Sequence, residues 1–234
     1  MQSPESPKIV SLTYVKRRAA GEMRLELSDG RILTLDPDIA VRHGLARGMA
    51  LGADSEAEVM AEQDLLTARR RLVGYLSARR KTEVEARRYL RGLGYEGIAA
   101  DAAMDSACAL GYLDDGAYAE AFARGQTRAK RGPRAIRYEM LARGVAKETV
   151  EAAVAPLSGR DEQTELARSA AARRAGVIAA GEPDARAARA KLTAFLARRG
   201  FDLDVCTEIA KELLAAHARG DRDDDDDDDG TGDE

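Results

Sequence analysis

The chain has 234 residues, of which 44% are hydrophobic, 33% charged and 4% aromatic, and it contains no tryptophan. This composition fits a soluble globular protein, and the scarcity of aromatic side chains favours thin layers of helices over one thick core. No apolar run approaches the roughly 18 residues that cross a bilayer, and the N-terminus has no apolar signal-peptide core, so we expect a cytoplasmic protein without a membrane partner.

The formal net charge of −4 hides an uneven distribution. Residues 221–234 carry −9, including seven consecutive aspartates at 223–229, so the first 220 residues carry +5. Residues 69–91 and 124–147 each carry +7. Two basic clusters suggest a polyanionic partner, although solvated helix faces in an arginine-rich chain would give the same composition.

The two ends of the chain are predicted to be disordered, over residues 1–7 and 220–234. The aspartate run in the second of these segments has two interpretations. It either keeps the protein solvated or competes with DNA for the basic clusters.

Residues 8–35 are the part of the chain with β-strand character. Three short strands are expected there, because β-forming residues alternate or cluster and Ser28, Asp29 and Gly30 are typical of a hairpin turn. Pro37 is favourable in the first turn of a helix that we expect to run to about Arg47.

The strands and this short helix together form a predicted N-terminal module over residues 8–51. Asp36 is the expected N-cap of its helix, since an aspartate there accepts a hydrogen bond from a free amide of the first turn. Residues 52–58 are predicted to be a linker.

From about Val59 to Ala218 the apolar residues follow helical spacing, and three glycines that end helices mark a repeat. These glycines are Gly94, Gly144 and Gly200. Matching apolar residues surround them at equal offsets: Leu90, Met140 and Leu196; Tyr95, Val145 and Phe201; Met104, Val154 and Ala210. We therefore predict a mostly α-helical protein with three-helix repeats over residues 59–111, 112–157 and 158–219, stacked as an elongated curved solenoid.

Several local signals set the expected helix ends within the repeats. Thr82 and Glu85 have the spacing of a capping box, and Asp114 is a favourable N-cap. Pro133 is suited to the first position of a helix, after the break at the preceding glycine. The first helix of the third repeat is expected to fade over residues 176–184.

No catalytic or metal-binding arrangement is predicted. The cysteines, Cys108 and Cys206, are isolated and are expected to be buried free thiols. His43 and His217 are far apart in the sequence, and helix capping explains the adjacent acids Asp114-Asp115 better than metal binding does. We therefore expect a protein that is not an enzyme and that holds no cofactor.

The candidate binding surface consists of the cations of the first and second repeats. Thirteen of them form the predicted patches for a protein partner or DNA: Arg79, Arg80, Lys81, Arg87, Arg88, Arg91, Arg124, Arg128, Lys130, Arg131, Arg134, Arg137 and Arg143. Lys130 and Arg131 also suit a helix C-terminus, where cations complement the dipole. Tyr118, Phe122 and Tyr138 are interpreted as core residues rather than base-stacking platforms, so a protein contact is favoured over direct DNA binding.

The central repeat resembles the RecX family, regulators of the RecA recombinase. The residues that carry the resemblance are Gly111-Tyr112-Leu113-Asp114-Asp115, Tyr118-Ala119, Phe122, Lys130-Arg131-Gly132-Pro133, Ile136, and Leu141-Ala142-Arg143-Gly144-Val145. Ala86, Leu90 and Gly94 match the first repeat, and Leu45, Gly48 and Leu51 match the extension of some members. Gly125 departs from the bulkier residues of the family, and the aspartate run is not part of its pattern.

The resemblance implies a protein that binds RecA or its filament on single-stranded DNA and suppresses ATP hydrolysis and strand exchange. Single- or double-stranded DNA is a further expected partner, and a monomer is expected. Two alternatives remain: a basic helical protein that binds nucleic acid independently of RecA, for example in transcription regulation, and a purely structural interaction scaffold.

Overall fold

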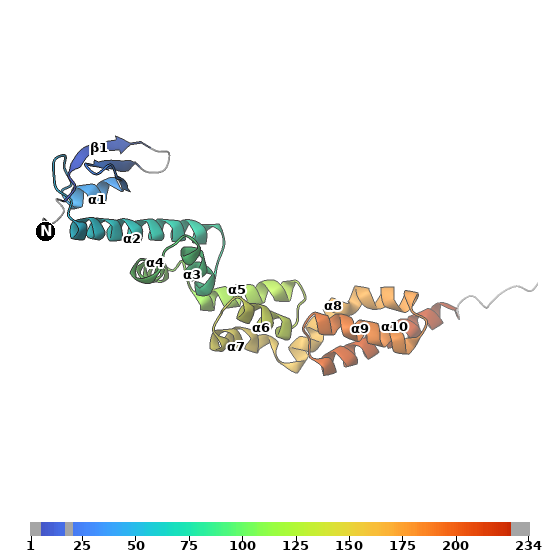
Figure 1. Ribbon diagram of the computed structural model, residues 1–234. Helices are drawn as coiled ribbons and strands as arrows, with labels where there is room; N and C mark the ends of the chain where they lie inside the picture. The colour runs from blue at the N-terminus through green and yellow to red at the C-terminus, as the bar shows by residue number, and fades with distance from the viewer. Residues whose placement is uncertain (1–5, 17–20, 226–234) are drawn as a thin grey trace, which may run out of the picture. The chain divides into compact units, whose positions relative to one another are not determined.

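The computed structural model describes residues 6–16 and 21–225 (Figure 1). The predicted disorder of residues 1–5 and of residues 226–234 lies outside this described part. Within it the protein is mostly helical, with one small sheet at its N-terminal end and three-helix repeats in tandem. The predicted fold class is confirmed in these respects.

The chain divides into two compact units. They consist of Met1–Arg80 with Glu85–Leu113, and of Lys81–Val84 with Asp114–Glu234. The first unit combines the N-terminal module with most of the first repeat, and the second contains the other two repeats.

An antiparallel sheet opens the first unit. Its strands are β1 (Ile9–Val15), β2 (Glu22–Leu27) and β3 (Ile32–Leu35), in the order β1-β2-β3. Leu25 and Leu27 are buried while the intervening Glu26 is exposed, because successive side chains of a strand point to opposite faces. The three predicted strands and their hairpin turn are confirmed.

Helix α1 (Pro37–Arg42) follows the sheet and begins as predicted. The Asp36 side chain accepts a hydrogen bond from the Asp38 amide at 3.0 Å, and Pro37 occupies the first turn. The expected end at Arg47 is wrong. The helix ends at Arg42 because the Leu45 amide bonds back to the Ala40 carbonyl at 2.9 Å, which closes the last turn.

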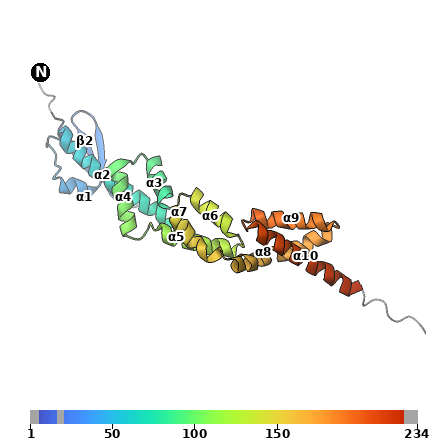
Figure 2. The same cartoon turned by 90° about the horizontal axis from the view of Figure 1, so that it is seen from below.

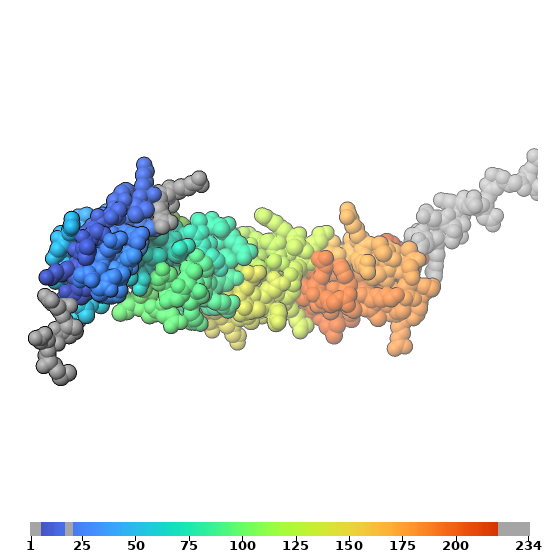
Figure 3. Space-filling view, turned by 45° about the horizontal axis from the view of Figure 1, so that its top comes forward, coloured from blue at the N-terminus to red at the C-terminus, as the bar shows by residue number. Residues whose placement is uncertain are grey.

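The predicted linker over residues 52–58 is wrong, because helix α2 (Ala53–Ala78) begins at Ala53. Acidic residues in its first turn complement the helix dipole, and one of them, Glu56, pairs with Arg31 at 2.5 Å. The N-terminal part of α2 buries Val59 against the sheet, and its C-terminal part belongs to the core of the first repeat. The space-filling view shows the module (blue) closely packed on α2 (cyan; Figure 3).

Helices α3 (Glu83–Gly92) and α4 (Gly97–Ala109) complete the first repeat. Leu72 of α2, Leu90 of α3 and Met104 of α4 meet in one buried cluster. The rings of Tyr75 and Tyr89 stack beside it with centroids 4.1 Å apart. Alanines make up most of the rest of this cluster, together with Leu76 and Leu113, in agreement with the thin layers that the composition predicts.

The second unit consists of two further three-helix repeats. Its helices are α5 (Asp115–Arg128), α6 (Pro133–Ala142), α7 (Lys147–Val154), α8 (Arg160–Gly181), α9 (Ala185–Arg198) and α10 (Leu203–Asp225), with a short 3-10 turn at Ala155–Leu157. Figure 2 shows α8, α9 and α10 as one bundle. Helix α10 extends past the predicted start of the acidic tail at residue 220.

The three predicted glycine stops are confirmed and share one geometry. Gly94, Gly144 and Gly200 have φ of 86°, 84° and 90°, which only glycine adopts without strain. The amide of the following residue then bonds to the carbonyl five residues earlier, as from Tyr95 to Leu90 at 3.0 Å. Val145 to Met140 at 3.2 Å and Phe201 to Leu196 at 3.4 Å repeat this bond.

The first helix of the third repeat does not fade as predicted. Helix α8 continues through Gly176 to Gly181, because Ala171, Ala175 and Ile178 are buried in the core that it shares with α10. Tertiary packing thus overrides the low helix propensity of glycine.

We expect acid to weaken the third repeat. Arg168 holds the pKa of Glu212 below its usual range through hydrogen bonds of 2.8 and 3.0 Å. A carboxylate with a depressed pKa stabilises the fold above its unfolded pKa, and this contribution disappears as pH falls through the folded value. The melting temperature should therefore fall below about pH 4, and E212Q should lower it at pH 7 and reduce its change with pH. E58Q, at an exposed glutamate beyond the first turn of α2 and without an ion pair in the described residues, is the control, and an equal response of both variants would contradict the expectation.

Candidate interaction surface

The turn over residues 130–133, the centre of the predicted basic patch, joins the second repeat to the third. The Gly132 amide donates to the Arg199 carbonyl at 2.8 Å, and the Arg134 amide donates to the Gly200 carbonyl at 3.0 Å. The free amides at the start of α6 thereby meet the free carbonyls at the end of α9. We call this arrangement the repeat clasp.

Side chains of both repeats complete the repeat clasp. One Arg199 nitrogen donates to the carbonyls of Ala129 and Lys130, at 3.0 and 3.1 Å. The Lys130 ammonium donates to the Ser169 carbonyl of α8 at 2.8 Å. Lys130 also has φ of 58°, an unfavourable value for a side-chain-bearing residue. Lys130 therefore holds the two repeats together, in addition to any contact with a partner.

A related contact lies where residues 81–84 meet the end of α6. The Thr82 hydroxyl donates to the Arg143 carbonyl at 2.9 Å and is fully buried. Val84 packs so closely that a methyl group on Gly144 would lie 2.6 Å from it. Lys81 is only 8% exposed beside this contact, so its predicted place on an open cationic surface is wrong.

The adjacent acids Asp114 and Asp115 are helix caps, as predicted. Asp114 accepts from the Ala117 amide at 2.8 Å at the start of α5. Asp115 accepts from the Glu83 amide at 3.0 Å, at the start of α3. Among the described residues no group of three or more histidines, cysteines or acids could hold a metal ion.

Several of the predicted cations are paired with carboxylates. The pairs are Arg87 with Asp101 at 2.6 Å, Arg91 with Glu96 at 3.9 Å, Arg124 with Glu120 at 3.4 Å, Arg131 with Glu139 at 2.5 Å, and Arg137 with Glu151 at 2.8 Å. Arg137 is bidentate, and its hydrogen bonds lower the pKa of Glu151. Such pairs reduce the charge that these arginines offer to phosphates.

Other predicted cations remain available at the surface. Exposed arginines without an ion pair among the described residues are Arg79, Arg80, Arg88, Arg128 and Arg134. Arg143 places its guanidinium 5.3 Å from the centre of the Phe122 ring. Among the five exposed arginines without an ion pair, Arg79, Arg80 and Arg88 belong to the first unit. We call these three the open arginines.

The aromatic and cysteine side chains depart in part from the prediction. Tyr118 is buried and Phe122 half-buried, as expected of core residues, but Tyr138 is 75% exposed. Cys108 is also exposed, so its expected burial is wrong, whereas Cys206 is fully buried. Burial raises the pKa of the Cys206 thiol to about 11 and keeps it protonated at neutral pH.

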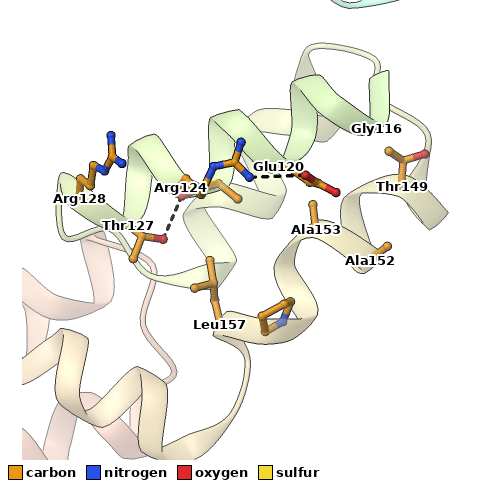
Figure 4. A pocket seen from close by; sticks show the side chains of 11 residues that line it. Gly116, Glu120, Arg124, Thr127, Arg128, Thr149, Ala152, Ala153 and Leu157 are labelled. Atoms are coloured by element: carbon orange, nitrogen blue, oxygen red, sulfur yellow. Dashed lines mark hydrogen bonds and ion pairs between the residues drawn. The ribbon is translucent and has the colours of Figure 1, made fainter. Parts of the chain in front are cut away.

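A groove between α5 and α7, of about 580 Å³, was not predicted (Figure 4). Its floor includes Ala153 and Leu157, and its edge includes Arg124 and Arg128. The sequence signal for it is Pro156, which stops α7 early.

None of the described helices is long and apolar enough to span a membrane.

Known proteins with the same organisation are regulatory proteins called RecX. Family models for the second and third three-helix domains of RecX match residues 114–154 and 161–209. A crystal structure of regulatory protein RecX superposes with a TM-score of 0.66 at 21% identity, covering 88% of this chain and 99% of that one. The RecX structure from Lactobacillus salivarius gives 0.58 at 22% identity, covering 64% and 96%. Both likenesses concern the fold.

Sequence relatives establish the family. Regulatory protein RecX of Clostridium perfringens is 22% identical over 206 residues, which are 88% of this chain and 96% of the relative. Regulatory protein RecX of Xanthomonas oryzae pv. oryzae is 36% identical over 132 residues, which are 56% of this chain and 79% of the relative. With this identity over most of the Xanthomonas protein, and with family domains on its second and third repeats, the chain belongs to the RecX family.

Proposed function

We propose that the chain binds RecA, or RecA assembled on single-stranded DNA, and lowers its ATP hydrolysis and strand exchange. In this role it would modulate recombination and DNA repair. Membership in the RecX family carries the proposal, since relatives along most of the chain are named regulatory proteins. The open arginines support it, because exposed guanidinium groups without acidic partners can approach the phosphates of a nucleoprotein filament.

The test is a titration of the full-length chain into RecA that hydrolyses ATP on single-stranded DNA. We expect ATP turnover to fall when the chain is present at well under one copy per RecA subunit. The inhibition should persist when additional single-stranded DNA exceeds the chain. Inhibition that disappears under excess DNA would indicate sequestration of DNA, as expected of a nucleic-acid-binding protein that acts independently of RecA.

A further inference from the structure

The α5–α7 groove has an apolar floor and an edge on which two arginines, Arg124 and Arg128, outnumber one acid, Glu120. Ala123, Ala153 and Leu157 line it with apolar atoms. Thr127 adds its methyl group, because its hydroxyl already donates to the Ala123 carbonyl at 2.9 Å. Small side chains at these positions leave room for another backbone to approach α5 closely. The groove is therefore suited to a protein segment that packs against its apolar floor, rather than to the sugar-phosphate backbone of a nucleic acid alone.

The groove exists because α7 is the shortest third helix of the three repeats. It has 8 residues, whereas α4 has 13 and α10 has 23. Pro156 ends the helical path in a 3-10 turn. Helix α5 has 14 residues and is thus about 9 Å longer than its cover, at ~1.5 Å per residue. In the third repeat the equivalent face of α8 is covered by α10 and buries Ala171 and Ala175.

The charge of the groove edge favours an acidic partner segment. Arg128 has no ion pair among the described residues, and Arg124 is one turn away on the same edge. The ion pair of Arg124 with Glu120 is weak, since it measures 3.4 Å and both side chains are more than 60% exposed. Figure 4 shows both arginines on α5 and the small residues of α7 facing the open space.

We propose that the α5–α7 groove binds an acidic amphipathic helix of a protein partner. The helix would lie beside the uncovered end of α5, with apolar residues on the floor and a carboxylate on Arg128. This is the helix-in-groove mode of recognition, in which apolar residues at helical spacing provide the contact. The inference rests on the proposed function, in that RecA is the partner whose segment is expected there.

Two variants of the full-length chain test the groove. A152Y blocks it with a bulky side chain at an exposed position of α7, and R128E reverses the charge of its edge. We expect each to weaken binding to the RecA filament by about tenfold or more, as for central interface residues. The matched controls A172Y and R174E lie at exposed positions of α8 outside the groove and should bind within about twofold of the parent protein. Circular dichroism melting verifies that all four fold.

The occupant is identified by photo-cross-linking from A155C, an exposed position beside the lining residue Pro156, in a C108S background. We expect a cross-link to an acidic helical segment of RecA. A cross-link to single-stranded DNA, to residues 221–234 of this chain or to a second copy would overturn the proposal. Unchanged filament binding by A152Y and R128E would overturn it while leaving the proposed function intact. Failure of the parent protein to bind RecA at all would instead defeat the proposed function.

Discussion

Replacing Gly200 by alanine should be among the most destabilising single-methyl changes in this protein. Gly200 has φ of 90°, which costs a side-chain-bearing residue about 1–2 kcal/mol. Its methyl group would also overlap the backbone of Ala135 in α6, and overpacking against backbone costs about 1–3 kcal/mol. We expect G200A to lower the free energy of unfolding by about 2–5 kcal/mol in urea titrations followed by circular dichroism.

The repeat clasp predicts a second effect of G200A, on cooperativity. Repeat proteins gain part of their stability from the interfaces between neighbouring units. Separation of the second and third repeats should therefore broaden the unfolding transition or split it in two, which lowers the apparent m-value. G132A should act in the same direction through its overlap with the Gly200 carbonyl, but less strongly, since its backbone conformation is an ordinary one.

The matched control is G125A in the middle of α5. Apart from the neighbouring residues and the backbone of its own helix, no atom lies within 4 Å of the added methyl group, and alanine is the better helix former by about 1 kcal/mol. G125A should therefore stabilise the protein, with the opposite sign to G200A. A similar change for both variants would mean that the clasp contributes nothing to the stability of the repeats.

Local signals account for the part of the fold that the sequence predicted correctly. A glycine stop, an aspartate N-cap and a proline at a helix start each act within one helical turn, so the ends of α5 and α6 could be inferred from neighbouring residues. The predicted linker failed because an acidic segment rich in small residues suits either a linker or a first helical turn. Burial of Val59 against the sheet decides between them, and that contact is not visible in sequence spacing.

The candidate surface was less predictable because its electrostatics depend on tertiary partners. Arg137 is separated from Glu151 by 14 positions, and the Gly132 amide from the Arg199 carbonyl by 67. No periodicity rule relates such positions. The sequence identified the basic residues, and the packing of helices determined which of them are neutralised or buried. Pro156 was visible in the sequence. That it leaves part of α5 uncovered can be inferred only by comparing the lengths of the third helices of all three repeats.

The open arginines should contribute more to filament binding than an equal number of paired arginines. Replacing Arg79, Arg80 and Arg88 by glutamine removes three exposed charges that have no ion pair among the described residues. If all three approach phosphates, the slope of log K against log salt should become shallower by about 2, since each contact on single strands contributes ~0.7. We expect about 10- to 100-fold weaker binding to the RecA filament at low salt.

The control for this set changes the formal charge by the same amount at paired positions. The triple variant R87Q/R131Q/R137Q removes arginines that already contact Asp101, Glu139 and Glu151. It should change the slope of log K against log salt only a little. Arginines that are already paired with carboxylates neutralise few phosphates, so they release few counterions from the DNA. Fluorescence anisotropy with labelled filaments at several salt concentrations measures both variants. Equal loss in the two sets would mean that total charge, rather than the open arginines, governs binding, and no loss in either would exclude both sets from the interface.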